Sequence, residues 1–224
     1  MCTIEWRKYP QPRIRHHTNP QVYLPRAQLQ VVPPSYPPLI ESIDWGEVFG
    51  NAAAPTLLDI GCGMGRFVLE YAVNHPSENV IGLEVRKPAV DWISNVIMGE
   101  GIRNAAVFWY SVANGIGFFD SGSLRAVTYF FPDPWFKKRH AKRRAFTLGL
   151  AAEIWRVLSD DGALFLMTDV PEVDKYQRDI LLEHGGFTIE EVTSDDRWFV
   201  EQTNQELFCR SKGIPYVRLR CAKR

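Results

Sequence analysis

The most unusual stretch of the chain is FFPDPWFKKRHAKRR, residues 130–144, in which two prolines bracket an acid. Because Pro132 and Pro134 restrict the backbone on both sides of Asp133, the sequence predicts a carboxylate on a stiff mount. Trp135 offers a flat surface on which a base can stack, and the six Lys and Arg residues that follow suit phosphate groups. The same pattern also fits a structural role, in which a rigid turn leads into a basic helix.

A glycine-rich loop, DIGCGMG at residues 59–65, follows a short apolar run and precedes a helical pattern. Gly61, Gly63 and Gly65 give the spacing GxGxG, which differs from the GxGxxG of dinucleotide binders, and no Lys-Ser or Lys-Thr follows as in a P-loop. Such glycines let the backbone approach a ligand closely at the carboxyl end of a strand. On its own, the loop is also consistent with a simple tight turn between a strand and a helix.

Two acids accompany this loop. Glu84 ends the next predicted strand, 25 residues after Asp59, where a carboxylate can accept hydrogen bonds from the two hydroxyls of a ribose. Asp59 lies in an apolar strand end and needs a cationic or hydrogen-bonding partner. No second acid or Arg marks a pyrophosphate or 2′-phosphate site, so the pattern favours the aminoacyl sulfonium S-adenosylmethionine over NAD(P).

Two further segments combine polar residues with ordinary helix signals. Asp169 ends a predicted strand at the same edge, but it also stands where it could cap the helix that begins near Pro171. The segment TNQE, Thr203 to Glu206, matches the S/T-x-x-E capping box, so a helix start alone explains it well. Both segments therefore have a structural and a functional interpretation.

Alternating elements provide the frame for these residues. Strands are predicted at 56–61, 79–85, 105–110, 124–131, 163–168, 187–192 and 214–221, and helices at 66–75, 88–101, 142–158 and 171–186. This alternation predicts an α/β fold with a mostly parallel, doubly wound sheet. Because the carboxyl ends of such strands share one edge, we expect the glycine loop, Glu84, Asp133 and Asp169 to lie together.

The first part of the chain has a different character. Residues 1–50 are rich in proline and basic residues and show little periodicity, which predicts an extended N-terminal arm that is at best partly ordered. Residues 51–224 contain the alternating pattern and form a second unit, a single α/β domain.

Composition argues against several classes of protein. No apolar run reaches the ~18–20 residues that span a bilayer, and the basic N-terminus lacks the apolar core of a secretory signal. The four cysteines are scattered, without a CxxC pair or a histidine at ligand spacing. We therefore expect no disulfide framework, no metal site and a cytoplasmic location.

The net charge is zero, with 26 basic and 26 acidic residues, yet the charges are segregated along the chain. Residues 1–30, 137–144 and 210–224 carry +4, +6 and +6, so the remainder of the chain carries −16. One basic run would indicate only a solvated surface, whereas three suggest a face for a polyanion on an acidic body.

Together these motifs resemble the bacterial tRNA (guanine-N7-)-methyltransferases of the TrmB family. The similarity runs from RIRHHTNPQ at 13–21 through DIGCGMG, IGLEV, the 130–144 segment and TNQE to the C-terminus, and the PDPWFKKRHAKRR string is its most specific part. The resemblance implies a Rossmann-like class I S-adenosylmethionine-dependent methyltransferase domain at 51–224. It also implies methylation of N7 of guanine 46 in the variable loop of tRNA.

The resemblance further implies roles for individual residues. Asp133 is the implied catalytic residue. The implied cofactor-binding residues are Asp59, Gly61, Gly63, Glu84, Asn114 and Asp133. The implied substrate-binding residues are Lys137, Asp169, Thr203 and Glu206, and the implied RNA-binding residues are Arg139, His140, Lys142, Arg143 and Arg144.

One position departs from the family pattern. The family places Asp or Asn before Ala after the third strand, near the adenine of the cofactor, whereas this chain reads YSVANG at 110–115. Val112 stands at that position and Asn114 follows two residues later. Either Asn114 substitutes after a local shift, or the adenine amino group is contacted by backbone atoms.

Two other classes of function stay open. A class I methyltransferase that acts on a protein or a small molecule would not need three basic segments beside its site. A non-catalytic RNA-binding module would not need the acids at 59, 84, 133 and 169. We expect a monomer or a homodimer, with tRNA as partner and no membrane partner.

Overall fold

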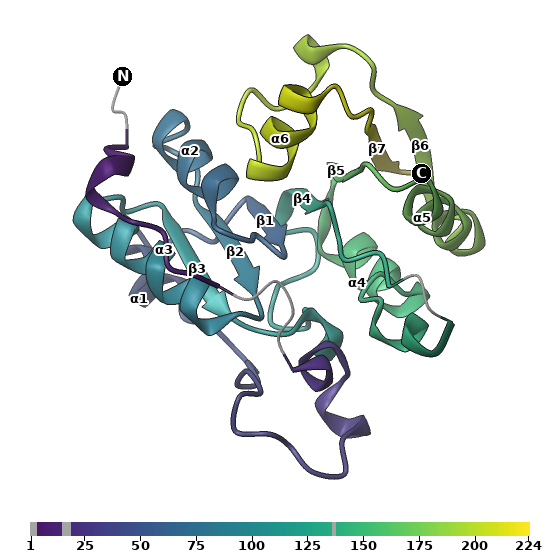
Figure 1. Ribbon diagram of the computed structural model, residues 1–224, viewed down its shortest axis with the longest axis horizontal. Helices are drawn as coiled ribbons and strands as arrows, with labels where there is room; N and C mark the ends of the chain where they lie inside the picture. Colours follow the sequence, from purple (N-terminus) through teal and green to yellow (C-terminus); the bar gives the residue numbers. More distant parts are fainter. Residues whose placement is uncertain (1–3, 15–18, 136–137) are drawn as a thin grey trace.

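The computed structural model describes residues 4–14, 19–135 and 138–224, with the backbone alone at 138, 139 and 141. A seven-stranded sheet lies at its centre, with helices on both faces (Figure 1). The strands are β1 (Leu57–Ile60), β2 (Val80–Glu84), β3 (Ala105–Trp109), β4 (Leu124–Phe130), β5 (Leu158–Thr168), β6 (Phe187–Glu191) and β7 (Val217–Lys223). The helices are α1 (Trp45–Phe49), α2 (Arg66–Asn74), α3 (Lys87–Gly99), α4 (Leu148–Val157), α5 (Pro171–His184) and α6 (Asn204–Lys212).

The strand order β3-β2-β1-β4-β5-β7-β6 confirms the predicted doubly wound sheet. β1 to β5 pair in parallel, and β7 is antiparallel to its neighbours β5 and β6. The order of the strands reverses at β1, which has β2 on one side and β4 on the other. Sheets of this kind bind ligands outside the carboxyl ends of their strands at this switch point.

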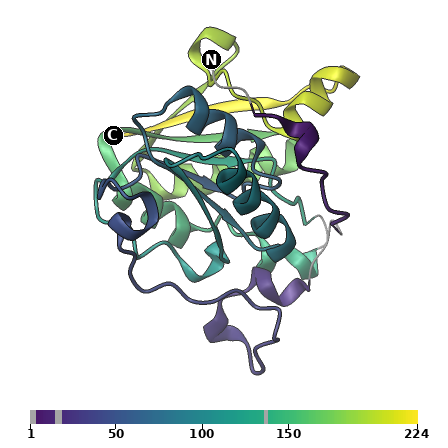
Figure 2. The same cartoon turned by 90° about the vertical axis from the view of Figure 1, so that its left-hand side faces the viewer.

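Both faces of the sheet are buried, as expected for parallel strands covered by helices. On one face, Leu58, Ile81 and Leu164 belong to a core shared with α1, α4 and α5. On the other face, Leu57 and Val80 pack with α2 and α3. Figure 2 views the molecule from the side on which α3 lies.

The helix predicted at 142–158 begins later than expected, and this part of the prediction is wrong. Lys138–Arg143 form a short 3₁₀ helix, and α4 starts only at Leu148. Thr147 fixes this start, because its Oγ1 accepts a hydrogen bond from the Leu150 N–H at 3.2 Å. Lys and Arg favour helices by propensity, but the cap outweighs that weak preference. The other predicted helices and the seven predicted strands have counterparts in the structure.

The described parts of the N-terminal arm pack on the domain more closely than the sequence predicts. Trp6 stacks on Trp92 of α3 with ring centroids 6.3 Å apart, and Trp92 Nε1 donates a hydrogen bond to the Pro10 carbonyl at 3.1 Å. Further along, the Ser111 hydroxyl donates to the carbonyl of the buried Val22 at 2.5 Å. The arm is thus held at two separate places.

A helix that the proline-rich pattern does not predict, α1, lies at the end of the 1–50 segment. Asp44 caps it, because Oδ1 accepts hydrogen bonds from the N–H groups of Gly46 and Glu47 at 2.8 and 3.4 Å. Phe49 is buried in the core shared with α4. The last residues of the segment therefore belong to the folded core.

Candidate active site

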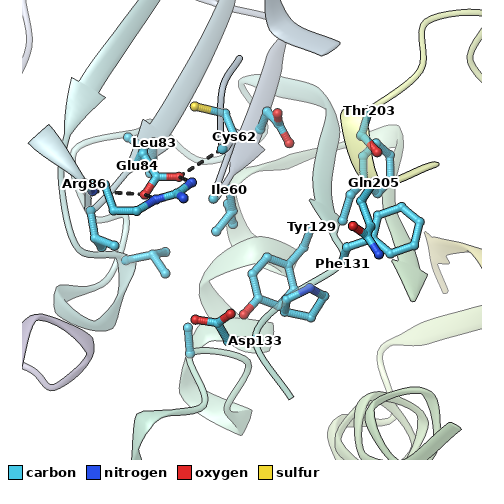
Figure 3. Close-up of a pocket in the computed structure, with 18 of the residues that line it drawn as sticks. Ile60, Cys62, Leu83, Glu84, Arg86, Tyr129, Phe131, Asp133, Thr203 and Gln205 are labelled. Atoms are coloured by element: carbon cyan, nitrogen blue, oxygen red, sulfur yellow. Dashed lines mark hydrogen bonds and ion pairs between the residues drawn. The ribbon is translucent and has the colours of Figure 1, made fainter. Parts of the chain in front are cut away.

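A cavity of about 580 Å³ opens at the carboxyl edge of the sheet (Figure 3). From the predicted site, its walls bring together Asp59, Gly61, Gly63, Glu84, Asp133, Asp169 and Thr203. Arg143, from the predicted RNA-binding stretch, also reaches it. Lys137 lies outside the described residues, as does the side chain of Arg139.

The glycine loop forms one wall because three of its residues take left-handed backbone angles. The φ angle is +71° at Gly61, +63° at Gly63 and +68° at Gly65, a region that favours glycine. A Cβ at Gly65 would lie 2.8 Å from Ile93 of α3, so packing excludes a side chain there. A Cβ at Gly61 would meet nothing within 4 Å, which shows that this residue borders open space.

Asp59, in β1, is a buried carboxylate with only 3% of its surface exposed. Thr128 Oγ1 donates to its Oδ1 at 2.6 Å, and within the described ranges no Lys or Arg forms an ion pair with it. Burial raises the pKa of Asp59 to about 7; the Thr128 hydrogen bond opposes this rise and the charge of Glu84 adds to it. A positively charged ligand group would relieve the cost of this charge.

Glu84 ends β2 and is held by four donors. The Gly63 N–H donates to Oε2 at 2.9 Å, which links the acid to the glycine loop. Arg86 donates from its backbone N–H, Nε and Nη2 at distances of 2.9–3.0 Å (Figure 3). The carboxylate is therefore fixed in the cavity wall, and Arg86 is a cavity residue that the motif analysis did not single out.

Asp133 stands on a strained loop that follows β4. Phe131 and Trp135, on either side of the two prolines, have φ angles of +48° and +43°, which are costly for residues other than glycine. The Phe131 N–H donates to the Met167 carbonyl of β5 at 2.7 Å and anchors the start of the loop. The loop thus holds the exposed Asp133 at the cavity wall on a constrained backbone.

Tyr23 of the arm also lines the cavity, and no motif pointed to it. Its ring meets that of Trp135 edge-on, with centroids 5.1 Å apart. Burial, and next the charge of Asp133, raise the pKa of Tyr23 well above its ordinary value, so the Tyr23 hydroxyl stays protonated in the neighbourhood of Asp133. Its local sequence signal, Asn19-Pro20, predicts a turn but not a contact with so distant a loop.

The structure does not bring Asn114 to the cavity, contrary to the expected cofactor contact. Residues 110–113 line the wall, but the Asn114 side chain turns toward the arm. Its Oδ1 accepts a hydrogen bond from the Arg26 N–H at 2.8 Å, and its Nδ2 donates to the Tyr36 hydroxyl at 3.0 Å. Asn114 therefore fastens the arm to the domain. Because its amide is already paired with Arg26 and Tyr36, it does not point into the cavity.

The TNQE segment divides its residues between the helix and the cavity. Thr203 caps α6, because its Oγ1 accepts the Glu206 N–H at 2.9 Å, which confirms the helix-start interpretation. Gln205 lines the cavity and donates to Asp169 Oδ2 at 3.2 Å. Gln205, which lies within the TNQE motif but was not among the predicted site residues, therefore orients the Asp169 carboxylate in the cavity wall.

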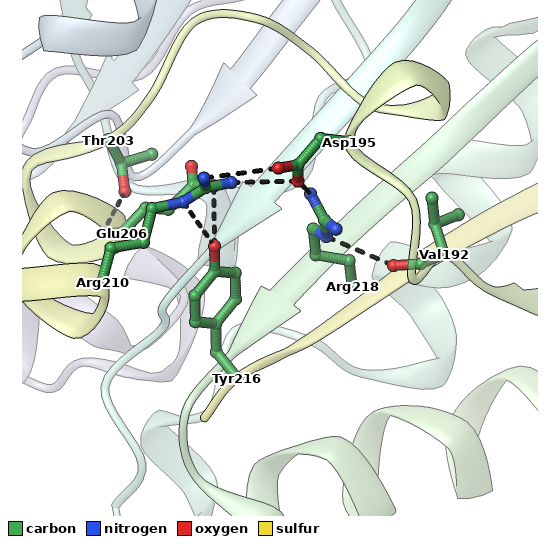
Figure 4. A network of polar contacts seen from close by, with 7 residues as sticks. All are labelled: Val192, Asp195, Thr203, Glu206, Arg210, Tyr216 and Arg218. Atoms are coloured by element: carbon green, nitrogen blue, oxygen red, sulfur yellow. Dashed lines mark hydrogen bonds and ion pairs between the residues drawn. The ribbon is translucent and has the colours of Figure 1, made fainter. Parts of the chain in front are cut away.

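Glu206 is not among the cavity walls but belongs to a polar network under α6 (Figure 4). It is 1% exposed, and its Oε1 accepts hydrogen bonds from the Tyr216 hydroxyl at 3.0 Å and from Arg210 at 3.2 Å. Arg210 and Arg218 also pair with Asp195, at 3.1 and 2.7 Å. The network ties α6 to β7, and it neutralises two cations of the basic 210–224 segment.

The basic stretch after the strained loop folds back on aromatic rings. The Arg143 guanidinium lies 5.0 Å from the centre of the Trp135 ring, and that of Arg144 lies 4.6 Å from a tyrosine ring of α5. His140 meets Trp135 edge-on at 5.8 Å, and Lys142 is exposed. Arg143 thus brings a positive charge to the cavity wall.

In the same described ranges, no group of three or more His, Cys, Asp or Glu side chains is arranged to hold a metal ion. None of their helices combines the length and apolar character that crossing a membrane requires.

The known proteins that are similar to this chain are methyltransferases. A family model described as "Putative methyltransferase" matches residues 53–214. A tRNA (guanine-N(7)-)-methyltransferase from Synechococcus sp. (strain JA-3-3Ab) is 35% identical over 208 residues, covering 92% of this chain and 84% of that protein. One from Synechocystis sp. is 32% identical over 214 residues, covering 92% and 95%. The chain belongs to the tRNA (guanine-N7-)-methyltransferase family.

Solved structures of low sequence identity share the fold of this family member. The 16S rRNA methyltransferase KamB has a TM-score of 0.58 at 14% identity, covering 83% of this chain and 95% of its own. The aminoglycoside resistance methyltransferase NpmB1 has a TM-score of 0.56 at 16% identity, covering 82% and 95%. The predicted class I methyltransferase fold is confirmed.

The donor set of the cavity fits S-adenosylmethionine. The buried carboxylate of Asp59 would suit the ammonium group of its methionine part, and Glu84, in the same wall, would accept from the ribose hydroxyls in exchange for donors of Arg86. The open space beside Gly61 leaves room for ligand atoms close to the backbone.

Asn114→Ala should loosen the arm of this tRNA (guanine-N7-)-methyltransferase family member without weakening cofactor binding. The change removes the acceptor of the Arg26 N–H, so trypsin should cleave after Arg26 about tenfold faster. The dissociation constant for S-adenosylmethionine, measured by calorimetry, should stay within about twofold. Gln28→Ala, an exposed change on the same segment, is the matched control. A large loss of cofactor affinity with unchanged cleavage would restore a direct cofactor contact.

Asp59→Asn should stabilise the protein without ligand at neutral and alkaline pH. The pKa of Asp59 rises from its ordinary 3.8 to about 7 on folding, so the buried charge destabilises the fold progressively as pH rises through that window. The amide removes this penalty. We expect a gain on the order of 2 kcal/mol at pH 8 and almost none near pH 4, measured by denaturant unfolding.

The same variant should bind the cofactor more weakly, by at least about tenfold at pH 8, because the amide cannot neutralise an ammonium group. Wild-type affinity should rise from pH 6 to pH 8 as Asp59 ionises, and the variant should lack this dependence. If Asp59→Asn instead changes the free energy of unfolding equally at pH 4 and pH 8, the charge of Asp59 does not cause the stability difference.

Proposed function

We propose that this protein transfers the methyl group of S-adenosylmethionine to N7 of a guanine in tRNA. Relatives that span most of the chain carry the name tRNA (guanine-N(7)-)-methyltransferase. The observation that carries the proposal is Asp133 on its strained loop, in the wall of the same cavity as Asp59 and Glu84. Guanine 46 of the variable loop is the position that the motif resemblance implies.

The chemistry asks the protein for positioning more than for proton transfer. N7 of guanine carries an in-plane lone pair and no proton, so no general base is needed. S-adenosylmethionine supplies, when bound, a methyl group on a positively charged sulfur. The chain must hold the guanine in line with that methyl group and stabilise the positive charge that develops on the ring.

Asp133 and Asp169 suit both tasks. Their carboxylates can accept hydrogen bonds from N1–H and the exocyclic amine of guanine, a donor pair that adenine lacks. A site built on such acceptors rejects adenine strongly, because carboxylates that the bound base covers would be left without partners. Gln205 orients Asp169 through a 3.2 Å hydrogen bond, and the constrained backbone between Phe131 and Trp135 orients Asp133.

The remaining predicted contacts with substrate and RNA come from the basic stretch after Trp135 and from the TNQE segment. Substrate roles for Lys137 and Thr203 and RNA roles for Arg139, His140, Lys142, Arg143 and Arg144 are part of the proposal. Arg143 has the most support, because it lines the cavity and lies against Trp135. Glu206 acts through α6 and not by direct contact. The cytoplasmic location and the monomeric or homodimeric state stay predictions.

Incubation with labelled S-adenosylmethionine and an unmodified tRNA transcript tests the function, with Asp133→Asn as the matched variant. The wild type should form 7-methylguanosine, and a transcript with adenine in place of guanine 46 should accept no methyl group. Asp133→Asn keeps the size of the side chain but not its charge. Its turnover should fall about a hundredfold or more, while its dissociation constant for tRNA changes by less than about threefold.

Several outcomes would contradict this assignment. RNA binding without methyl transfer would make the protein a binding module, and transfer to a protein or small molecule in place of RNA would change the substrate class. Methylation of another guanine would keep the reaction but move its position. Near-normal turnover of Asp133→Asn would remove Asp133 from the chemistry.

Arg143→Ala should weaken tRNA binding and make it less sensitive to salt. If the guanidinium contacts one phosphate, the slope of log Kd against log salt concentration should fall in magnitude by about 1. Filter binding between 50 and 200 mM salt measures this slope. Lys175→Ala removes an exposed cation of α5 and serves as the control. An unchanged slope for Arg143→Ala would place this arginine away from the phosphates.

A further inference from the structure

A second cavity, of about 220 Å³, adjoins the main one on the side of the arm. Met64, Arg66 and Asn204 line both cavities, so the two share a wall at the end of the glycine loop and the start of α6. The other walls come from α3 and the arm. They are formed by Trp6, Tyr9, Gln11 and Trp92.

Two tryptophans line this second cavity: Trp92 is buried in α3, and the partly exposed Trp6 presents its ring to the cavity. The rings of Trp6 and Trp92 are nearly parallel, with 11° between their planes. Trp92 is fixed by the hydrogen bond from Nε1 to the Pro10 carbonyl. The Tyr9 hydroxyl lies so close to Gly99 of α3 that a Cβ there would clash with it. The contacts between the arm and α3 therefore hold the rings in place.

The polar groups of the cavity are one cation, two amides and the Tyr9 hydroxyl, and none of the lining residues is an acid. The Arg66 guanidinium lies 5.7 Å from the centre of the Trp6 ring, and its Nη2 pairs with Glu70 at 2.8 Å. Its Nε is buried and has no hydrogen-bond partner in the part of the chain that the structure describes. Gln11 and Asn204 add amides that can donate and accept hydrogen bonds.

This combination fits a nucleobase and its phosphate. Bases of every kind stack on aromatic rings, amides pair with base edges, and a guanidinium attracts phosphate. A cage for a cationic ligand would not have an arginine in its wall. The volume of the second cavity is below the roughly 300–1,000 Å³ of sites for drug-sized molecules, which favours one base over a larger ligand.

We propose that the second cavity binds the base of an unpaired nucleotide next to the target guanine in the same tRNA. This inference rests on the proposed function. Because the two cavities share a wall, an RNA strand that places the guanine in the first brings a neighbouring nucleotide to the second. The neighbouring base would fix the register of the strand, and the arm would form part of the RNA-binding surface.

Transcripts with an abasic nucleotide on one or the other side of the target guanine test this, together with Trp6→Ala. For the wild type, one of the two abasic transcripts should show a KM raised about tenfold, the loss of one base–aromatic stack. Trp6→Ala should raise the KM for the ordinary transcript by a similar factor. The two losses should not add when combined, because both remove the same contact. The KM for S-adenosylmethionine should change by less than about twofold.

Two variants serve as controls. Trp6→Phe should recover most of the affinity because a planar ring remains. Trp155→Ala changes a 38%-exposed tryptophan of α4, beyond the opposite face of the sheet, and should leave both KM values unchanged. The abasic transcripts need no change in the protein, so a folding defect of a Trp6 variant cannot imitate their effect.

Three results would overturn the inference. These are equal KM values for the ordinary and both abasic transcripts, fully additive losses, or a KM for S-adenosylmethionine that rises in Trp6→Ala as much as that for tRNA. The last would assign the second cavity to the cofactor. If the wild type methylates no tRNA, the proposed function itself fails; if it methylates all three transcripts alike, only the second cavity is excluded.

Discussion

The burial of two carboxylates at the ends of neighbouring parallel strands is the constraint on which the rest of this structure depends. Glu84 at the end of β2 is satisfied by the backbone of Gly63 and by Arg86, so it helps to shape the glycine loop. Asp59 in β1 has the Thr128 hydroxyl instead, and burial leaves its pKa at about 7. A fold keeps such an expensive group where a ligand compensates its charge, which is why this edge of the sheet is the site.

The same edge of the sheet also carries backbone strain. Phe131 and Trp135 hold left-handed backbone angles on either side of a Pro-Asp-Pro turn. Contacts over-determine that loop: the β5 carbonyl of Met167 binds its start, and Tyr23 and Arg143 pack on Trp135 at its end. These contacts hold the strained backbone and leave Asp133 little freedom, which suits the role proposed for it in positioning a guanine whose N7 has no proton to lose.

Local sequence patterns predict most of the strands and helices and those parts of the site that directly follow a strand. Parallel strands bring their carboxyl ends to one edge, so the glycine loop, Glu84 and Asp133 could be placed together from spacing alone. Tyr23 and Asn114 could not, because their roles depend on where a proline-rich segment returns to the domain. Sequence resemblance suggested a substrate contact for Glu206, whereas its partners are Arg210 of α6 and Tyr216, the residue before β7. Contacts between distant segments are decided by tertiary packing, which local periodicity does not record.

The N-terminal arm differs most between what the sequence predicts and what the structure shows. Proline-rich composition predicts an extended chain with little order, but it also lowers the conformational entropy that the chain loses when it docks. A few anchors then suffice: the Trp6–Trp92 stack, the Ser111 hydroxyl on Val22 and the Asn114 amide. These anchors join the arm to α3 and to the loop after β3, and not to a strand of the sheet, so the arm builds cavity walls from Tyr23 and Trp6 beside an intact sheet. The composition that suggests disorder is thus what lets a distant segment form part of the active site.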